Sequence, residues 1–377
     1  MRWSPIVLAL ALLAPAARAD PPAPTVEPKP EPLLVVERRP SLDPVEGSAG
    51  PATAAGTTGL HVQLGLEAFI AYDLRVSPTP GGTQWFHEFQ IPRAHVSFDG
   101  LYGPVRARVV IEAVRSSSEG ALLGVAGDSF VMRLREASAG YRLGKWLAID
   151  AGVVPTLTIP ELDGTFALRA VAATPLESTG LGSPADLGVT ARFDLPAGYG
   201  YLAAGGYNGE GYNNRELNRG KNVEGAIEIH PAPGGSAKPL ALFASFVNGS
   251  TGTASARALR LTAALLWQGR RVRAGADFVY AWGVGENGDQ RSYLVDGFVR
   301  VEPIDRLLLG ARAFHWMRDT RAPEDRVTEV TGAAGFRIAD PLEAFLSLTR
   351  TLPEAKAAAA LPGLDRWDAR IIARVVF

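Results

Sequence analysis

The chain has 377 residues, of which 47% are hydrophobic, and a formal net charge of −1. This near-neutral balance lacks the broad positive field that nucleic-acid binding needs, so we expect no nucleic-acid partner. The sequence contains no cysteine, which excludes thiol catalysis, thiolate metal sites and disulfide bonds. The five histidines are dispersed, and no nucleophile elbow, phosphate-binding loop or zinc-protease motif occurs. We therefore predict no enzymatic activity, no metal site and no cofactor.

Residues 1–19 have the features of a secretory signal peptide. Arg2 supplies a positive start, residues 6–13 form an apolar core, and Ala17-Arg18-Ala19 is a small-residue cleavage motif. We predict cleavage rather than membrane anchoring, because the apolar core is too short to span a bilayer. Residues 20–57 are rich in proline and cannot bury a core, so we predict a disordered arm on the periplasmic side.

Polar and apolar residues alternate in successive segments between residues 58 and 377. Alternation with a period of two predicts strands that have one apolar and one polar face. In the last segment, arginine or aspartate occupies positions 366, 368, 370 and 374, and apolar residues occupy the alternate positions up to Phe377. The predicted strands lie near residues 60–73, 86–99, 104–115, 130–142, 145–155, 186–195, 199–208, 221–230, 239–249, 256–268, 270–282, 291–303, 305–318, 327–339, 341–351 and 366–377.

The predicted connections alternate between tight turns and long loops. Tight turns are predicted at 100–103, 143–144, 196–198, 268–270, 303–304 and 339–341. Long polar loops are predicted at 77–85, 116–129, 156–185, 209–220, 283–290, 319–326 and 352–365, with 231–238 and 249–255 as exceptions to the alternation. Short turns at one end and long loops at the other are typical of membrane barrels. The predicted fold is therefore all-β, a transmembrane antiparallel β-barrel of about sixteen strands with an aqueous lumen over residues 58–377.

The polar faces of these strands should line the lumen, because a charge facing lipid at the bilayer midplane costs about 2–4 kcal/mol. The arginines predicted to line the pore are Arg93, Arg106, Arg108, Arg133, Arg135, Arg192, Arg271, Arg273, Arg312, Arg370 and Arg374. Carboxylates on the same faces nearly balance them, so the arginines either attract anions or pair with carboxylates that brace the wall. Glu136 and His315 share a face with apolar neighbours, which predicts a bulge or a shifted boundary at each.

The connection 156–185 is the longest and follows the fifth strand. It is too apolar for a free surface loop, since it contains Leu157, Ile159, Leu162, Phe166, Leu168 and Val171. We predict that it folds into the lumen and narrows it. The charged residues at the constriction would then be Glu161, Asp163, Arg169 and Glu177. The alternative is a lid packed over the outer rim.

Three stretches resemble the phosphate-selective porin O and P family of Gram-negative outer-membrane porins. They are residues 91–100, residues 136–161 and residues 174–188, and the resemblance extends over roughly residues 59–377. The chain departs from the family where selectivity would be decided. Lysine is almost missing from the barrel, and Gly152-Val-Val-Pro lacks the Gln-x-Lys expected after that glycine.

The resemblance implies a homotrimeric channel in the bacterial outer membrane, in contact with its lipid. Its function would be passive diffusion of small hydrophilic solutes, with a preference for anions such as phosphate. The terminal Phe377 would be read by the barrel-assembly machinery. The alternative is a structural or adhesive outer-membrane barrel with a plugged lumen.

Overall fold

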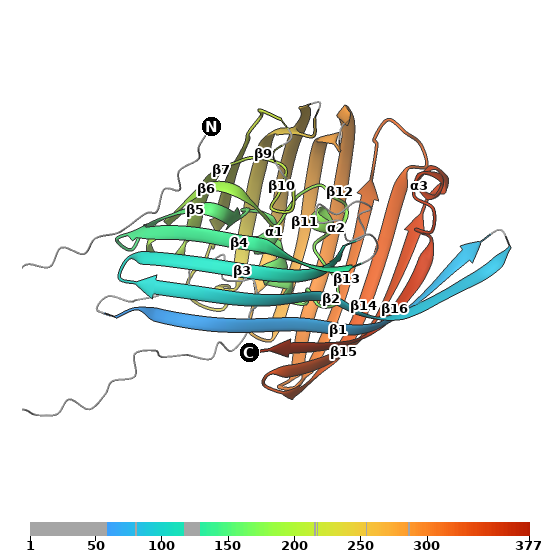
Figure 1. Cartoon of the computed structure of the whole chain (residues 1–377), viewed down its shortest axis with the longest axis horizontal. Helices are drawn as coiled ribbons and strands as arrows, with labels where there is room; N and C mark the ends of the chain where they lie inside the picture. Colours follow the sequence, from blue (N-terminus) through green and yellow to red (C-terminus); the bar gives the residue numbers. More distant parts are fainter. Residues whose placement is uncertain are drawn as a thin grey trace, which may run out of the picture. The chain divides into compact units, whose positions relative to one another are not determined.

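The computed structural model describes residues 59–79, 81–116, 129–214, 216, 218–253, 255–285 and 287–377. The predicted signal peptide and proline-rich arm lie outside these residues, as does most of the predicted loop 116–129. Sixteen antiparallel strands close into one barrel, in which each strand pairs with its neighbours in the chain and the first pairs with the last (Figure 1). The predicted fold class and strand number are confirmed.

The strands follow the predicted segments closely, mostly within a few residues at each end. They are β1 (His61–Thr79), β2 (Gly82–Tyr102), β3 (Val105–Ser116), β4 (Ser129–Leu143), β5 (Leu147–Pro155), β6 (Ala185–Asp194), β7 (Gly200–Tyr207), β8 (Asn222–Ile229), β9 (Leu240–Thr251), β10 (Ala256–Gln268), β11 (Val272–Val284), β12 (Asn287–Ile304), β13 (Leu307–Met317), β14 (Arg326–Ala339), β15 (Leu342–Pro353) and β16 (Arg366–Val376). The helices are α1 (Ile159–Phe166), α2 (Pro175–Ser178) and α3 (Ala355–Ala360), with a 3₁₀ turn η2 (Pro196–Gly198). Among the described residues, no helix is long and apolar enough to cross a membrane.

Two of the predicted long loops are wrong. Over 77–85, β1 and β2 continue as an antiparallel ribbon in which Thr79 still pairs with Gly82. Over 283–290, β11 and β12 continue to the pair Val284–Asn287. Both hairpin ends consist mostly of glycine, proline and polar residues. Their polar composition therefore lacks the alternation that marks a strand with one buried face.

The predicted bulge at Glu136 is confirmed. Val110 pairs with Glu136 and Ile111 pairs with Leu134, so Arg135 is the extra residue in β4. The bulge allows Arg135 and Glu136, adjacent in sequence, both to contact charges on the inner face. At His315, by contrast, no register shift occurs, since this residue pairs regularly with both neighbouring strands.

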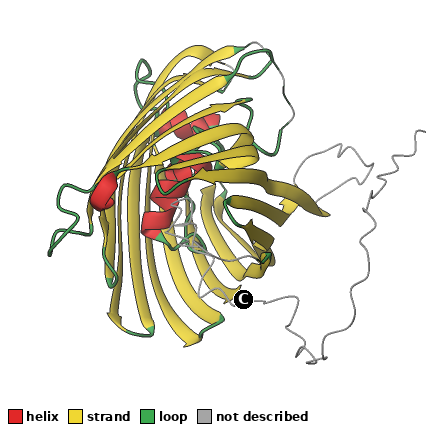
Figure 2. Ribbon diagram, turned by 90° about the vertical axis from the view of Figure 1, so that its left-hand side faces the viewer, coloured by secondary structure: helices red, strands yellow, loops and turns green. Residues whose placement is uncertain are grey.

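The long connection between β5 and β6 enters the barrel, and Figure 2 shows α1 and α2 inside the wall of strands. The predicted inward fold is confirmed. Its apolar side chains belong to one buried cluster with inward-facing side chains of the barrel, among them Phe243, Leu266, Val279, Leu294, Phe298, Leu308 and Phe314. Full burial of one such side chain contributes about 1.5–3 kcal/mol, so the loop is stabilised as a second hydrophobic layer.

Candidate functional site

The inserted loop, residues 156–184, divides the inner surface into two unlike walls. The inner faces of β9–β13 carry the barrel's part of the buried apolar cluster, together with a few polar and charged side chains. They are covered by the loop, with α1 lying against β10, β11 and β12. We call these faces the apolar wall. The inner faces of β2–β6 bear arginines and carboxylates, and we call them the charged wall. The seam of the barrel, formed by β1, β15 and β16, joins the two walls.

Local geometry turns the chain inward after β5. Gly152 has a φ of 120°, a left-handed conformation in which an added Cβ would collide with the carbonyl of Ala137 on β4. Pro160 lies in the first turn of α1, where its missing N–H costs nothing. Ala167 caps the end of the helix, with a φ of 52° and an N–H that donates to the carbonyl of Asp163.

The beginning of the inserted loop is held by a buried carboxylate on β8. Glu224 accepts hydrogen bonds from the backbone N–H of Leu157 at 2.9 Å and from the Thr158 hydroxyl at 2.7 Å. The same hydroxyl lies 2.7 Å from the Ser245 hydroxyl on β9. The loop is therefore tied to the wall at its entry, before α1 begins.

Wall arginines hold the rest of the loop by its backbone carbonyls. The donors and their acceptor carbonyls are Arg260 with Leu181 at 2.8 Å, Arg273 with Gly164 at 3.1 Å, Arg300 with Ala167 at 3.4 Å and Arg312 with Ala173 at 3.3 Å. A guanidinium carries five donors and no acceptor, which suits it to a segment that presents bare carbonyls. These contacts fix the loop without requiring a particular side chain on it.

Three arginines predicted to line the pore therefore have other positions. Arg312 lies beneath the loop, with its side chain 2% exposed and paired with Asp296. Arg273 also contacts the loop, at the carbonyl of Gly164. Arg271 lies in the turn after β10 and pairs with the exposed Asp305. The alternation pattern predicts whether a side chain faces the lumen or the lipid. It does not predict how far along the barrel axis the side chain lies, or whether another segment covers it.

The other predicted arginines lie on the charged wall or the seam, and each forms an ion pair. The pairs are Arg93, Arg133 and Arg135 with Glu112, Arg106 with Asp150, Arg108 with Asp99 and Glu136, Arg192 with Asp194, Arg370 with Asp73, and Arg374 with Glu67 and Glu343. The structure thus favours the bracing network over a row of unpaired cations.

Glu112 is the centre of this network. Its carboxylate is fully buried and lies 2.8 Å from Arg93 Nε, 2.8 Å from Arg133 Nε and 3.1 Å from His95 Nε2. The Tyr212 hydroxyl of the loop after β7 donates to it at 2.8 Å. Tyr212, which no sequence pattern marks, also lies 2.8 Å from Arg133 and thereby completes the cluster.

The four charged residues predicted for the constriction fall into two groups. Asp163, Arg169 and Glu177 are together, because Arg169 forms ion pairs with both carboxylates. Glu177 also reaches Arg93 on the charged wall at 3.3 Å. Burial and the neighbouring Arg93 lower the pKa of Arg169 to about 9. Burial alone would raise the pKa of Glu177, but Arg169 and Arg93 outweigh it and lower that pKa.

Glu161 lies apart from this group. It points from α1 towards β7, β8 and β10, where the Tyr201 hydroxyl donates to it at 2.9 Å and Gln268 at 3.2 Å. Burial and the nearby Glu228 raise the pKa of Glu161 to about 8.

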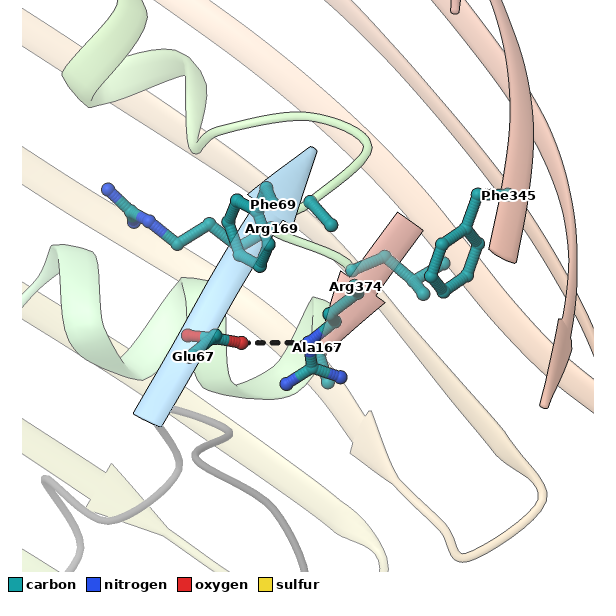
Figure 3. A pocket seen from close by; sticks show the side chains of 8 residues that line it. Glu67, Phe69, Ala167, Arg169, Phe345 and Arg374 are labelled. Carbon is teal, nitrogen blue, oxygen red and sulfur yellow. Dashed lines mark hydrogen bonds and ion pairs between the residues drawn. The ribbon is translucent and has the colours of Figure 1, made fainter. Parts of the chain in front are cut away.

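A narrow cavity lies between the loop and the seam (Figure 3). Glu67 and Arg374 face each other across its floor at 2.7 Å, and Arg169 comes to it from the loop. Phe69 and Phe345 supply apolar sides. The cavity is therefore lined by an ion pair and by two aromatic rings that belong to the same buried cluster as the loop.

Some inward arginines of the charged wall and the seam are partly exposed, while Arg93, Arg135 and Arg374 there are 16%, 10% and 9% exposed. The inward side chains of Arg106, Arg370, Arg133 and Arg108 are 40%, 33%, 31% and 30% exposed. Arg312 beneath the loop is 2% exposed. Water therefore reaches the charged wall and the seam, while the apolar wall is filled by the loop. Within the ranges that the structure describes, no group of three or more side chains is suited to a metal ion.

Sequence reasoning missed the apolar wall and the anchors on it. In β10, for example, Leu265 faces outward and is exposed, while Leu266 faces inward and is fully buried. A run that is apolar on both faces signals a strand covered on both sides, and this run could have revealed the contact. Glu224 carried no such signal, because a carboxylate on an inner face is expected in a water-filled barrel.

No family model matches this chain, and no curated protein matches it. Solved structures of outer-membrane proteins do match. OmpF of Salmonella typhi in complex with daunomycin aligns with a TM-score of 0.63 and 11% identity, over 84% of this chain and 97% of that one. The anion-selective porin from Comamonas acidovorans aligns with a TM-score of 0.57 and 10% identity, over 84% and 100%. OmpT of Vibrio cholerae aligns with a TM-score of 0.56 and 12% identity, over 86% and 100%. At these identities the similarity shows a shared fold.

Proposed function

We propose that this chain is a porin of the bacterial outer membrane, through which small hydrophilic solutes diffuse passively. The observation that supports this most is the solvent exposure of inward-facing arginines along the charged wall, opposite a loop that fills only the apolar wall. A barrel of sixteen strands encloses more space than wall side chains can fill. The outward rows of exposed apolar side chains, among them Phe98, Leu134, Phe278, Leu346 and Ile371, suit contact with lipid.

The anion preference implied by the family resemblance needs lumen cations in excess. Around the loop tip and the charged wall the charges balance, with Arg93, Arg108, Arg133, Arg135 and Arg169 set against Asp99, Glu112, Glu136, Asp163 and Glu177. We therefore propose weak selectivity between anions and cations. A strong phosphate preference would require unpaired arginines at this level of the lumen.

Planar-bilayer recording tests the proposal. The purified protein should insert with discrete conductance steps, and the reversal potential under a potassium chloride gradient should be small. Absence of steps in any salt would overturn the porin proposal and favour a plugged structural or adhesive barrel. A large reversal potential of the anion-selective sign would contradict the proposed balance of charges in the lumen. It would leave the porin proposal standing.

Two partner proposals accompany the function. We propose, on the family resemblance, that the protein is a homotrimer, which native mass measurement in detergent would test. We also propose that Phe377 is read by the barrel-assembly machinery. Its backbone pairs with Leu66 across the seam at 2.9 and 3.1 Å, while 43% of the residue is exposed. Deleting Phe377 should reduce the folded fraction in the outer membrane, and an unchanged fraction would contradict that role.

A further inference from the structure

Two carboxyl groups meet where α1 touches the inner wall. Glu161 comes from the first turn of α1, and Glu228 comes from β8. Gln268 on β10 bridges them, since its Nε2 lies 3.2 Å from Glu161 Oε1 and 3.4 Å from Glu228 Oε2. The Tyr201 hydroxyl on β7 donates to Glu161 Oε2 at 2.9 Å. Glu161 is thus joined to three strands through one carboxyl group.

A histidine continues this chain towards the surface. His230 Nε2 lies 2.9 Å from Glu228 Oε1, and His230 Nδ1 lies 3.2 Å from the carbonyl of Leu240. Because a carbonyl only accepts, Nδ1 carries a hydrogen. His230 therefore presents Nε2 to Glu228 and its Nδ1–H to the carbonyl of Leu240. His230 also lines a surface cavity with Pro233 and Lys238 at the short-turn end of the barrel, so solvent protons can reach it.

The charged groups around the cluster come from each neighbouring element. Arg192 of β6 stacks 3.6 Å above the Tyr201 ring and pairs with Asp194. Arg273 of β11 donates to the carbonyl of Gly164 in α1. Burial and the charge of Glu228 raise the pKa of Glu161, against a smaller lowering by Arg192. At neutral pH the docked Glu161 therefore keeps a proton.

We propose that Glu161, Glu228 and His230 form a proton-dependent latch that holds α1 against the inner wall and so controls the width of the lumen beside it. The latch rests on the proposed porin function. Protonated Glu161 can donate a hydrogen bond while it accepts one from Tyr201. When Glu161 ionises, two carboxylates repel each other across Gln268. The docking of α1 is then weaker and depends on its apolar contacts and on the hydrogen bond from Arg273 to Gly164.

The direction of the pH effect follows from the pKa of Glu161. This pKa is about 8 in the docked loop, against an ordinary value of 4.5 when the side chain is in water. The contribution of Glu161 to docking is therefore fully present below pH 4.5 and decreases as the pH rises. It is lost once the pH passes about 8. From about pH 6.5 to about pH 9 the undocked population should rise roughly 30-fold.

Thiol labelling measures that population independently of conductance. Because the chain has no cysteine, Thr165→Cys introduces a single thiol on α1 at a residue that is 2% exposed. Its labelling rate is normalised to that of a cysteine at the exposed Ser236, which corrects for ionisation of the thiol. The normalised rate should rise roughly 30-fold over this pH range, and single-channel noise should rise with it.

Variants separate the latch from general effects of pH. Glu161→Gln should remove the pH response of labelling and noise, whereas Asp340→Asn, at an exposed turn, should leave it unchanged. If Glu161→Gln does not fold, Glu228→Gln serves instead. It removes the charge that raises the pKa of Glu161, so the response should become smaller and end at lower pH. A flat labelling profile in the wild type, or a response that persists in Glu161→Gln, would overturn the latch. Absence of conductance with a normal labelling response would overturn the porin function alone.

Discussion

Phe166 offers the most direct test of how the inserted loop is held. It is the last residue of α1 and is 1% exposed. Its ring meets that of Phe298 on β12 edge to face at 5.4 Å, and the Arg312 guanidinium lies 5.0 Å from its centroid. Phe166→Ala removes all of these contacts and leaves the charges of the loop in place.

The magnitude follows from burial. Replacing a fully buried phenylalanine with alanine costs about 3–5 kcal/mol. The strands retain their hydrogen-bond ladder, so this cost should fall on docking of the loop rather than on the barrel. A loss of that size multiplies the undocked population by roughly 150- to 5,000-fold. The lumen beside α1 should then widen intermittently, and single-channel conductance should become larger and noisier.

The matched control is Phe278→Ala, since Phe278 is 47% exposed on the outer face of the neighbouring strand β11. Both variants should remain heat-resistant barrels by electrophoretic mobility. Only Phe166→Ala should show larger, noisier conductance and faster labelling of a cysteine at position 165. The reasoning is refuted if the two variants conduct alike, because the loop would then contribute nothing to the width of the lumen.

Three further variants test other parts of the site. Thr158→Cys with Ser245→Cys should form a disulfide on oxidation, since the two hydroxyls are 2.7 Å apart and the chain has no other cysteine; failure to oxidise would place the loop entry elsewhere. Deletion of residues 162–178 should leave a folded barrel with larger single-channel conductance, and unchanged conductance would contradict a constricting loop. Glu112→Gln should shift the reversal potential towards anions, because it leaves the surrounding guanidinium groups in excess; no shift would argue against a role for this cluster in the lumen field.

Much of the fold could be predicted from alternation, because lipid on one side and water on the other impose a strict period of two on each strand. The inward course of the loop was predictable for a related reason. Leu162, Phe166 and Leu168 would gain nothing in water and can be buried inside the barrel. The prediction failed at 77–85 and 283–290, where the strands continue through glycine, proline and polar residues and the period of two disappears.

The site was harder to predict, because its properties depend on contacts between distant segments. Arg106 and Arg312 both occupy inward positions, yet one meets water and the other lies beneath the loop. Alternation treats them alike. Only the path of the loop decides which of them can meet a solute. The same holds for Glu161, whose neighbour Glu228 lies on a strand that the sequence places far from it.

Register decides the field inside the lumen more than composition does. Asp99 pairs directly with Arg108, Glu112 with Arg133, and Asp73 with Arg370, each pair on adjacent strands. A shift of one residue in any of these ladders would turn one partner to the lipid face. Partly exposed ion pairs contribute little to stability, typically about 0–1 kcal/mol, so folding energy alone does not account for this arrangement. Its physical consequence is a wall of paired charges, whose net potential cancels within a Debye length of about 8 Å. A polar solute that moves along such a wall can form hydrogen bonds with donors and acceptors along the lumen. Neither anions nor cations are bound strongly there.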